Sequence, residues 1–61
     1  MATRIRWTEV LLIGRTAITF VPPIQVADRD RARWSLATAH HVPEDNVVLE
    51  LDGSGATVLH R

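Results

Sequence analysis

The stretch that decides the fold is NVVLELDGSGATVLHR, residues 46–61 of the given sequence. In it, two runs of alternating apolar residues flank Asp52-Gly53-Ser54-Gly55, and a glycine-containing turn between such runs is the strongest short-range signal for a β-hairpin. A two-residue turn at Gly53-Ser54 predicts the cross-strand pairs of one apolar face, which are Leu51 with Ala56, Leu49 with Val58 and Val47 with His60. The other face keeps Val48 and Leu59, so we expect both faces of this hairpin to be covered.

The amino-terminal third of the chain predicts a second hairpin. Arg4–Ile13 alternates with the period of a strand, and Thr16–Val21 is rich in β-branched and aromatic residues. Gly14-Arg15 lies between them as a two-residue turn. This register predicts the pairs Leu11 with Ile18 and Glu9 with Phe20. The carboxylate of Glu9 must then lie near an edge, pair with an arginine or take part in an interface.

Between the hairpins, residues 28–42 (DRDRARWSLATAHHV) change to a helical pattern. Asp28 is the predicted N-cap and Pro43 ends the helix. The apolar positions predicted on one side of it are Ala32, Leu36 and Ala39. Two ion pairs at i,i+3 spacing are expected, Asp28 with Arg31 and Asp30 with Arg33. A third hairpin, with alternating Trp34, Leu36, Thr38 and His40, is the alternative that the sequence leaves open.

The predicted fold class follows from this order of elements. We expect one α+β, β-rich domain over residues 1–61, with two β-hairpins flanking one short helix in the order β-β-α-β-β. An all-β small barrel is the alternative if residues 28–42 form strands.

Composition limits how such a chain can be stabilised. A domain of 61 residues buries only about 60% of its unfolded surface, and this chain has no cysteine for a disulfide or a thiolate metal site. Seven arginines balance seven acidic residues, but residues 1–34 carry a net charge of +3 and residues 35–61 a net charge of −3. Oligomerisation is therefore the expected source of further buried area, and the opposite charges of the two halves suit contacts between subunits.

The sequence shows no pattern that predicts a membrane-spanning or exported protein. Its longest apolar run, Val10–Ile13, is too short to cross a bilayer, and its amino-terminal residues lack the pattern of a cleaved signal peptide. We expect no membrane partner, and a soluble protein in the cytoplasm or, if the chain is viral, in the virion.

Candidate chemistry is limited to one group of side chains, which are His40, His41, Glu44, Asp45 and His60. Neighbouring histidines on a helix point about 100° apart, so they do not form the i,i+4 pair of a zinc-binding helix. We interpret these imidazoles as side chains that interact with the free carbonyl groups of a helix end. The chain has no cysteine nucleophile, and neither Ser35 nor Ser54 stands in a recognisable catalytic pattern. We expect no enzyme, no metal and no cofactor.

Three segments together resemble a known family. Residues 18–23 (ITFVPP), which precede the predicted helix, and residues 42–45 (VPED) and 47–61 (VVLELDGSGATVLHR), which follow it, are arranged as in one group of DNA-binding proteins. They resemble the strand, short helix, Pro-Gly-Asp turn and carboxyl-terminal hairpin of the swapped-hairpin proteins of the AbrB and MazE type. Proteins of that family form interlaced dimers that bind DNA as antitoxins or transition regulators. The resemblance implies such a dimer here, with Arg4, Arg6 and Arg15 as DNA contacts.

The residues themselves favour a non-catalytic structural or assembly subunit, for example a component of a viral particle or of another multi-subunit shell. Both hairpins keep apolar residues on both faces, more than one helix can cover. We therefore expect association through these faces, either with copies of the chain or with other subunits. The residues predicted at or beside the contact are Trp7, Val10, Leu12, Val48 and Leu59. A dimeric DNA-binding regulator is the alternative.

Overall fold

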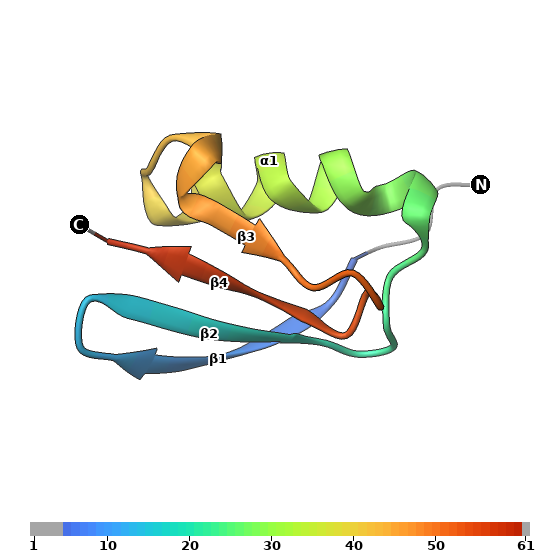
Figure 1. Ribbon diagram of the computed structural model, residues 1–61, viewed down its shortest axis with the longest axis horizontal. Coiled ribbons are helices and arrows are strands. Elements are labelled where there is room, and N and C mark those ends of the chain that lie inside the picture. Colours follow the sequence, from blue (N-terminus) through green and yellow to red (C-terminus); the bar gives the residue numbers. More distant parts are fainter. Residues whose placement is uncertain (1–4, 61) are drawn as a thin grey trace.

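One helix packs on one face of a four-stranded antiparallel sheet in the computed structural model of the chain, which describes residues 5–60 (Figure 1). The elements in chain order are β1 (Trp7–Leu12), β2 (Arg15–Phe20), α1 (Arg29–His40), β3 (Val47–Leu49) and β4 (Gly55–Leu59), with short 3-10 turns at Val26–Asp28 and Glu44–Asn46. Across the sheet the strands follow the order β1-β2-β4-β3. The predicted α+β class and β-β-α-β-β order are confirmed. The barrel and the third hairpin are wrong, because residues 29–40 are helical.

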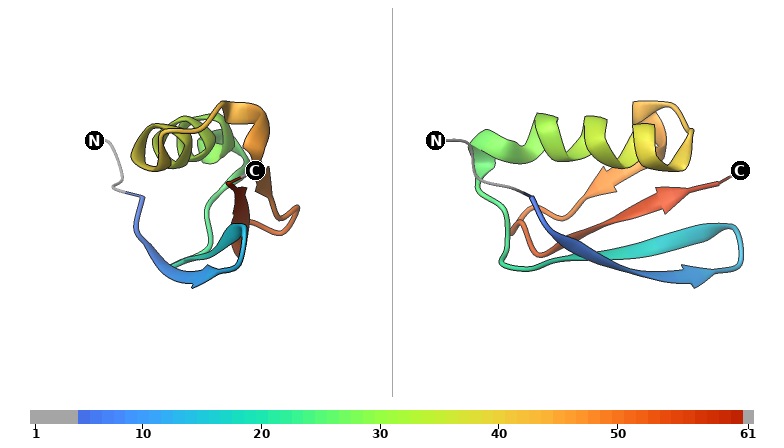
Figure 2. Two further views of the ribbon diagram at one scale, coloured as in Figure 1. Left: turned by 90° about the vertical axis from the view of Figure 1, so that its left-hand side faces the viewer. Right: turned by 180° about the vertical axis from the view of Figure 1, so that it is seen from behind.

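The hydrophobic core lies between α1 and the side of the sheet that curves around the helix (Figure 2). We call this side the inner face of the sheet and the opposite side the outer face. Strands β2, β3 and β4 each bury alternate residues against the helix, as the period of two in a strand requires. The buried apolar residues are Ile18, Phe20, Ala32, Leu36, Ala37, Val47, Leu49, Ala56 and Val58.

The ends of the helix lie close to those that the sequence predicts. Asp28 occupies the N-cap position, although its side chain makes no capping hydrogen bond. At the other end His41 takes the left-handed conformation with φ 56°. Its amide donates to the carbonyl of Thr38, and the amide of Val42 donates to that of Ala37. These two bonds form a Schellman motif, which satisfies carbonyl groups that the end of a helix leaves free.

The side of α1 that faces the sheet differs from the prediction at one position. Ala32 and Leu36 are buried as expected, but Ala37 is buried in place of Ala39. The buried side is centred near Leu36 and Ala37, so that Ala39 lies beyond its border on the solvent side.

The ion pairs predicted along α1 do not form among the described residues. Arg33 instead donates from Nη1 to the backbone oxygen of Val47 at 2.8 Å, and Arg29 donates to that of Glu50 at 2.8 Å. The helix lies beside β3, and a backbone carbonyl at a strand edge accepts a charge-assisted hydrogen bond. Two of the helix arginines therefore hold α1 against the β3 segment.

The observed register of the first hairpin differs from the predicted register by two residues. Its turn lies at Ile13-Gly14, because the second central position has φ 75°, a value that glycine adopts without steric cost. The observed pairs include Leu11 with Thr16 and Glu9 with Ile18. A shift of two residues leaves every side chain on its predicted face. Glu9 lies on an edge strand, one of the places that the sequence allowed for it.

The second hairpin is shifted in the same way. Its observed pairs are Val47 with Val58, Val48 with Thr57 and Leu49 with Ala56. A loop over residues 51–54 replaces the predicted two-residue turn. In it the amide of Gly53 donates to the carbonyl of Glu50, and the amide of Ser54 donates to the Asp52 carboxylate at 2.9 Å. Because Asp52 forms this local turn, Leu51 leaves the predicted apolar face and is 91% exposed.

Candidate interaction surface

The outer face of the sheet carries two rows of side chains that no described element covers. Residues that pair directly across neighbouring strands lie on the same face, so that the strand registers define these rows. The first row crosses all strands of the sheet and consists of Val10, Ala17, Thr57 and Val48. The second row consists of Leu12, Arg15 and Leu59. The four large apolar side chains in these rows are between 42% and 59% exposed.

Most of the residues predicted at a contact gather on this outer face. They are Val10, Leu12, Val48 and Leu59. Trp7 lies on the inner face, half-buried against the core, and its indole Nε1 donates to Oε2 of Glu9 at 2.8 Å. The outer face therefore presents an apolar surface on its own, and Trp7 contributes to the packing behind it.

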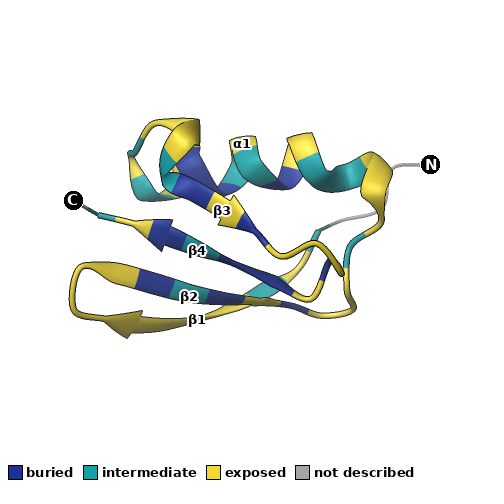
Figure 3. Cartoon of the chain, viewed as in Figure 1, coloured by how far each residue is buried: buried dark blue, intermediate teal, exposed yellow. Residues whose placement is uncertain are grey.

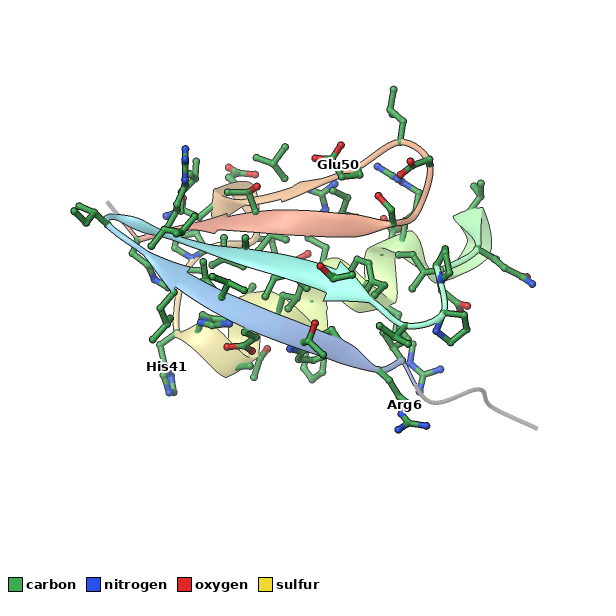
Figure 4. All side chains as sticks on the ribbon, turned by 90° about the horizontal axis from the view of Figure 1, so that it is seen from below. Arg6, His41 and Glu50 are labelled. Atoms are coloured by element: carbon green, nitrogen blue, oxygen red, sulfur yellow. The ribbon has the colours of Figure 1, made fainter. Side chains whose placement is uncertain are left out.

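Charges of opposite sign lie at two places on the outer face. Arg15 stands in the second row, between Leu12 and Leu59. Glu50 follows β3 directly, and its amide donates to the carbonyl of Gly55, so that it continues the alternation of the strand and is exposed (Figure 4). The face thus carries both a cation and an anion beside its apolar rows, which a second outer face could match with opposite charges.

The two edges of the sheet differ in how they are protected. β1 forms one edge, and all of its residues except the half-buried Trp7 are exposed (Figure 3). β3 forms the other edge, is only three residues long, and has the carbonyl of Val47 bonded to Arg33 of α1. Short strands and covering elements are the usual protection of sheet edges. Sequence reasoning missed this contrast, although WTEVLL (residues 7–12) holds neither the lysine nor the proline common at such edges.

A polar cluster on the inner face joins side chains from distant parts of the sequence. Oε2 of Glu9, which accepts from Trp7, also lies 3.3 Å from Nε2 of His40. The ring of His40 meets that of His60 in an edge-to-face arrangement, with centroids 5.4 Å apart. Nε2 of His60 is 2.7 Å from the hydroxyl oxygen of Thr16. Of the predicted chemical group, the fold brings together only His40 and His60, and it adds Glu9 and Thr16.

This cluster has no geometry that we can assign to catalysis or metal binding. The side chain of Thr16 is fully buried, so its hydroxyl cannot meet a substrate as a nucleophile. His41 points away from the sheet (Figure 4), and Glu44 and Asp45 belong to the next 3-10 turn. Within residues 5–60, no three or more His, Cys, Asp and Glu side chains are grouped so as to hold a metal ion.

The arginines expected to contact DNA are not gathered by the fold. Arg4 lies outside the described residues. Arg6 precedes β1, whereas Arg15 pairs with Leu12 at its far end. Six residues of extended chain separate these two positions along the hairpin, about 20 Å at roughly 3.4 Å per residue. The structure therefore separates Arg6 and Arg15 instead of forming one basic patch.

Comparisons with protein-family models, with curated proteins and with solved structures found no match to this chain. No helix among the described residues has the length and apolar character needed to cross a membrane. The surfaces of the fold, in particular the outer face and the β1 edge, are therefore the observations from which a function can be argued.

Proposed function

We propose that this chain is a non-catalytic assembly subunit that associates with further copies of itself through the outer face of its sheet. The observation that carries the proposal is the pair of rows on that face, in which Val10, Leu12, Val48 and Leu59 remain about half exposed. A small domain with little core gains stability when such side chains are buried between copies. A multi-subunit shell, for example a viral particle, is the kind of assembly that suits such a subunit.

The expected strength of this contact can be bounded. Full burial of a Val or Leu side chain contributes about 1.5–3 kcal/mol, so one that passes from half exposed to buried contributes roughly 1 kcal/mol. Two copies bring eight such side chains together, whereas association costs on the order of 4–15 kcal/mol. The apolar gain is therefore comparable to the cost, and we expect association that depends on concentration.

Electrostatics favours a second copy as the occupant of the outer face. Arg15 and Glu50 both stand on it, and two faces that meet can bring the arginine of one copy toward the glutamate of the other. Opposite charges across a contact fix its orientation more than its strength. We therefore expect the association of copies to weaken as salt screens these side chains, while the apolar contribution persists.

Sedimentation of the pure protein over a range of concentrations tests the proposal. The wild-type chain should sediment faster than its 6.8 kDa monomer as concentration rises, whereas the double variant Val48→Glu, Leu59→Glu should stay folded and form smaller assemblies than the wild type at the same concentration. Trp34→Glu is the matched control, since Trp34 is 59% exposed on α1 and away from the outer face. A wild-type monomer at all concentrations, or equal loss in the control, would contradict the proposal.

The DNA-binding alternative predicts a different outcome. A swapped-hairpin regulator should retard duplex DNA in a gel, with an affinity that falls steeply with salt, and Arg6→Ala or Arg15→Ala should each reduce the salt slope by about one unit. For an assembly subunit we expect no retarded band at low or moderate salt. A salt-dependent band that both variants weaken would favour the regulator.

A further inference from the structure

The edge of β1 is a second exposed surface of the sheet, distinct from the outer face. β1 has six residues, and its residues from Thr8 to Leu12 are all exposed. Beyond it, Ile13 at the turn is fully exposed. This edge strand has no lysine or proline, no described element covers it, and its one inward-pointing charge, Glu9, lies in contact with Trp7 and His40 of the same chain. Such a strand offers its backbone to another strand. The opposite edge cannot serve in this way, because β3 is short and Arg33 occupies the carbonyl of Val47.

The pattern of backbone hydrogen bonds identifies the residues that face this free edge. The amide of Val21 donates to the carbonyl of Arg6 at 3.0 Å, which marks their pairing as hydrogen-bonded. Hydrogen-bonded and non-hydrogen-bonded pairs alternate along an antiparallel ladder. Even-numbered residues of β1 therefore bond to β2, and the amides and carbonyls of Trp7, Glu9 and Leu11 point toward the open side.

We propose that β1 pairs antiparallel with β1 of a second copy, about a two-fold axis that passes Val10. The inference rests on the proposed function, since it concerns how copies assemble, but it uses the strand edge and not the outer face. The partner is a second copy because β1 is complementary to itself. Its outward amides and carbonyls recur at every second residue, so an antiparallel copy can pair with them.

The register follows from charge and from the length of strand that is paired. The outward-facing odd residues must pair with odd residues, so the axis passes a residue and not a gap between residues. An axis at Glu9 would place the carboxylates of both copies directly opposite each other. An axis at Leu11 would leave only residues 10–12 of the strand paired. An axis at Val10 pairs residues 8–12 and sets Glu9 opposite Leu11 of the second copy.

This arrangement accounts for apolar side chains that the isolated chain leaves in water. Leu11 is 78% exposed, although its pairing with the buried Thr16 places it on the inner side of the first hairpin. In the Val10 register Leu11 comes beside the methylene groups of Glu9 of the second copy. On the outer face, Val10 meets Val10 and extends its row into a second sheet of the same kind.

Cysteine crosslinking tests the register directly, because the natural chain has no cysteine. In the proposed dimer the two Val10 residues form a non-hydrogen-bonded pair with Cα atoms about 4.5 Å apart, which a disulfide can bridge. Val10→Cys should therefore form a covalent dimer under mild oxidation. Thr8→Cys is the matched control on the same face, since its two copies would lie about 14 Å apart along the strands. Equal crosslinking of the two variants, or none in Val10→Cys, would overturn the proposal.

A backbone variant separates edge pairing from contact through the outer face. Leu11→Pro removes an amide that points outward and leaves the ladder with β2 intact, as proline on the open side of an edge strand permits. It should lower the crosslinking yield of Val10→Cys at least tenfold, whereas Leu11→Thr, which keeps the amide, should lower it less. If the proline variant does not fold, Leu11→Glu serves the same purpose, because it places a carboxylate opposite Glu9 of the second copy and like charges directly across a strand pair are destabilising.

The two proposals can fail independently in these measurements. Association that the Val48→Glu, Leu59→Glu variant abolishes, with no effect of Leu11→Pro and no crosslinking at Val10, would leave the outer face as the contact and overturn edge pairing. Crosslinking at Val10 that Leu11→Pro removes, in a chain whose association is unchanged by Val48→Glu and Leu59→Glu, would support edge pairing and contradict the outer-face contact.

Discussion

Nε2 of His60 lies 2.7 Å from the hydroxyl oxygen of Thr16, and this hydrogen bond joins the carboxyl-terminal end of the chain to a fully buried position in β2. Buried hydroxyl groups are costly unless they find a partner. Thr16 is the only buried polar or charged residue within the described part of the chain, and its partner lies 44 residues away. The bond therefore links β2 to the residue that follows β4, so its loss should weaken the pairing of these two strands.

We expect Thr16→Val to lower the free energy of unfolding by about 0.5–1.5 kcal/mol, the net value of one hydrogen bond. The loss is moderate because the partly exposed His60 can bond to water instead. Thr57→Val is the control, since the hydroxyl of Thr57 makes no hydrogen bond among the described residues. Urea melts at low protein concentration give both values. A Thr16→Val chain as stable as the wild type would show that the bond contributes nothing.

Leu49 and Leu51 test the shifted register of the second hairpin. Leu49 is 8% exposed in the core, so Leu49→Ala should cost about 2–5 kcal/mol through lost transfer energy and the cavity left behind. Leu51→Ala should change stability by no more than about 0.5 kcal/mol, because Leu51 is 91% exposed in the loop. Urea melts of both variants at one protein concentration make the comparison. Similar losses would indicate the two-residue turn that places Leu51 on the apolar face.

Substitutions at Gly53 and Gly14 distinguish the cost of backbone strain from the cost of steric collision. Both have positive φ, 78° and 75°, so an alanine at either costs about 1–2 kcal/mol in strain. A Cβ at Gly14 would meet no heavy atom within 4 Å, whereas one at Gly53 would collide with the carbonyl oxygen of Ile24. The amide of Ile24 also donates to the carbonyl of Gly53.

We therefore expect Gly53→Ala to destabilise the chain clearly more than Gly14→Ala, as measured by thermal melts followed by circular dichroism. The collision forces the 51–54 loop away from the segment before α1 and breaks the contact between them. Equal melting temperatures for the two variants would mean that the loop shifts without cost, and that the packing of Ile24 against it contributes nothing.

The pH dependence of stability should include a contribution from Asp52. Hydrogen bonds from the side chain and the backbone of Ser54 hold the pKa of Asp52 below its ordinary value of 3.8. Because the folded-state pKa is the lower one, this carboxylate stabilises the fold above the unfolded pKa, and that stabilisation is lost as pH falls through the folded pKa.

Asp52→Asn should therefore be less stable than the wild type at neutral pH, and the difference should shrink below about pH 4. Ser54→Ala, which removes the hydroxyl donor, should reproduce part of the neutral-pH loss. Denaturant melts across the acid range measure both. A difference between Asp52→Asn and wild type that stays constant down to the lowest pH would show that the carboxylate charge is not involved.

The spacing of apolar residues predicted the elements and the faces of the strands, although it left open a third hairpin in place of the helix and placed Ala39 on the buried side of α1. It predicted both hairpins, the helix with its N-cap at Asp28, and four of the exposed apolar residues that lie on the outer face. It could not fix the register, because a shift of two residues keeps every side chain on the same face. The backbone conformation of the two turns sets the register instead: Gly14 has a positive φ, and Asp52 forms a local turn with Ser54.

The polar cluster and the edge contrast were beyond sequence reasoning for another reason. Glu9, His40 and Thr16 lie on different elements, and no local pattern indicates which distant side chains meet when the sheet curves around α1. Likewise the i,i+3 spacing predicted an ion pair between Arg33 and Asp30. In the structure the guanidinium of Arg33 donates to the carbonyl of Val47 instead. Contacts of this kind depend on tertiary packing, which single-sequence patterns do not contain.

The hydrogen bond from Arg33 to Val47 also limits how far pairing at strand edges can extend. A sheet with two open edges can add strands from chain after chain and grow into a fibre. Here Arg33 of α1 occupies a carbonyl of one edge, so that a pairing at β1 uses the only long open edge that residues 5–60 of each copy present. Growth then stops at eight strands, four from each chain. The chain can in this way keep an exposed apolar strand without the risk of unlimited polymerisation.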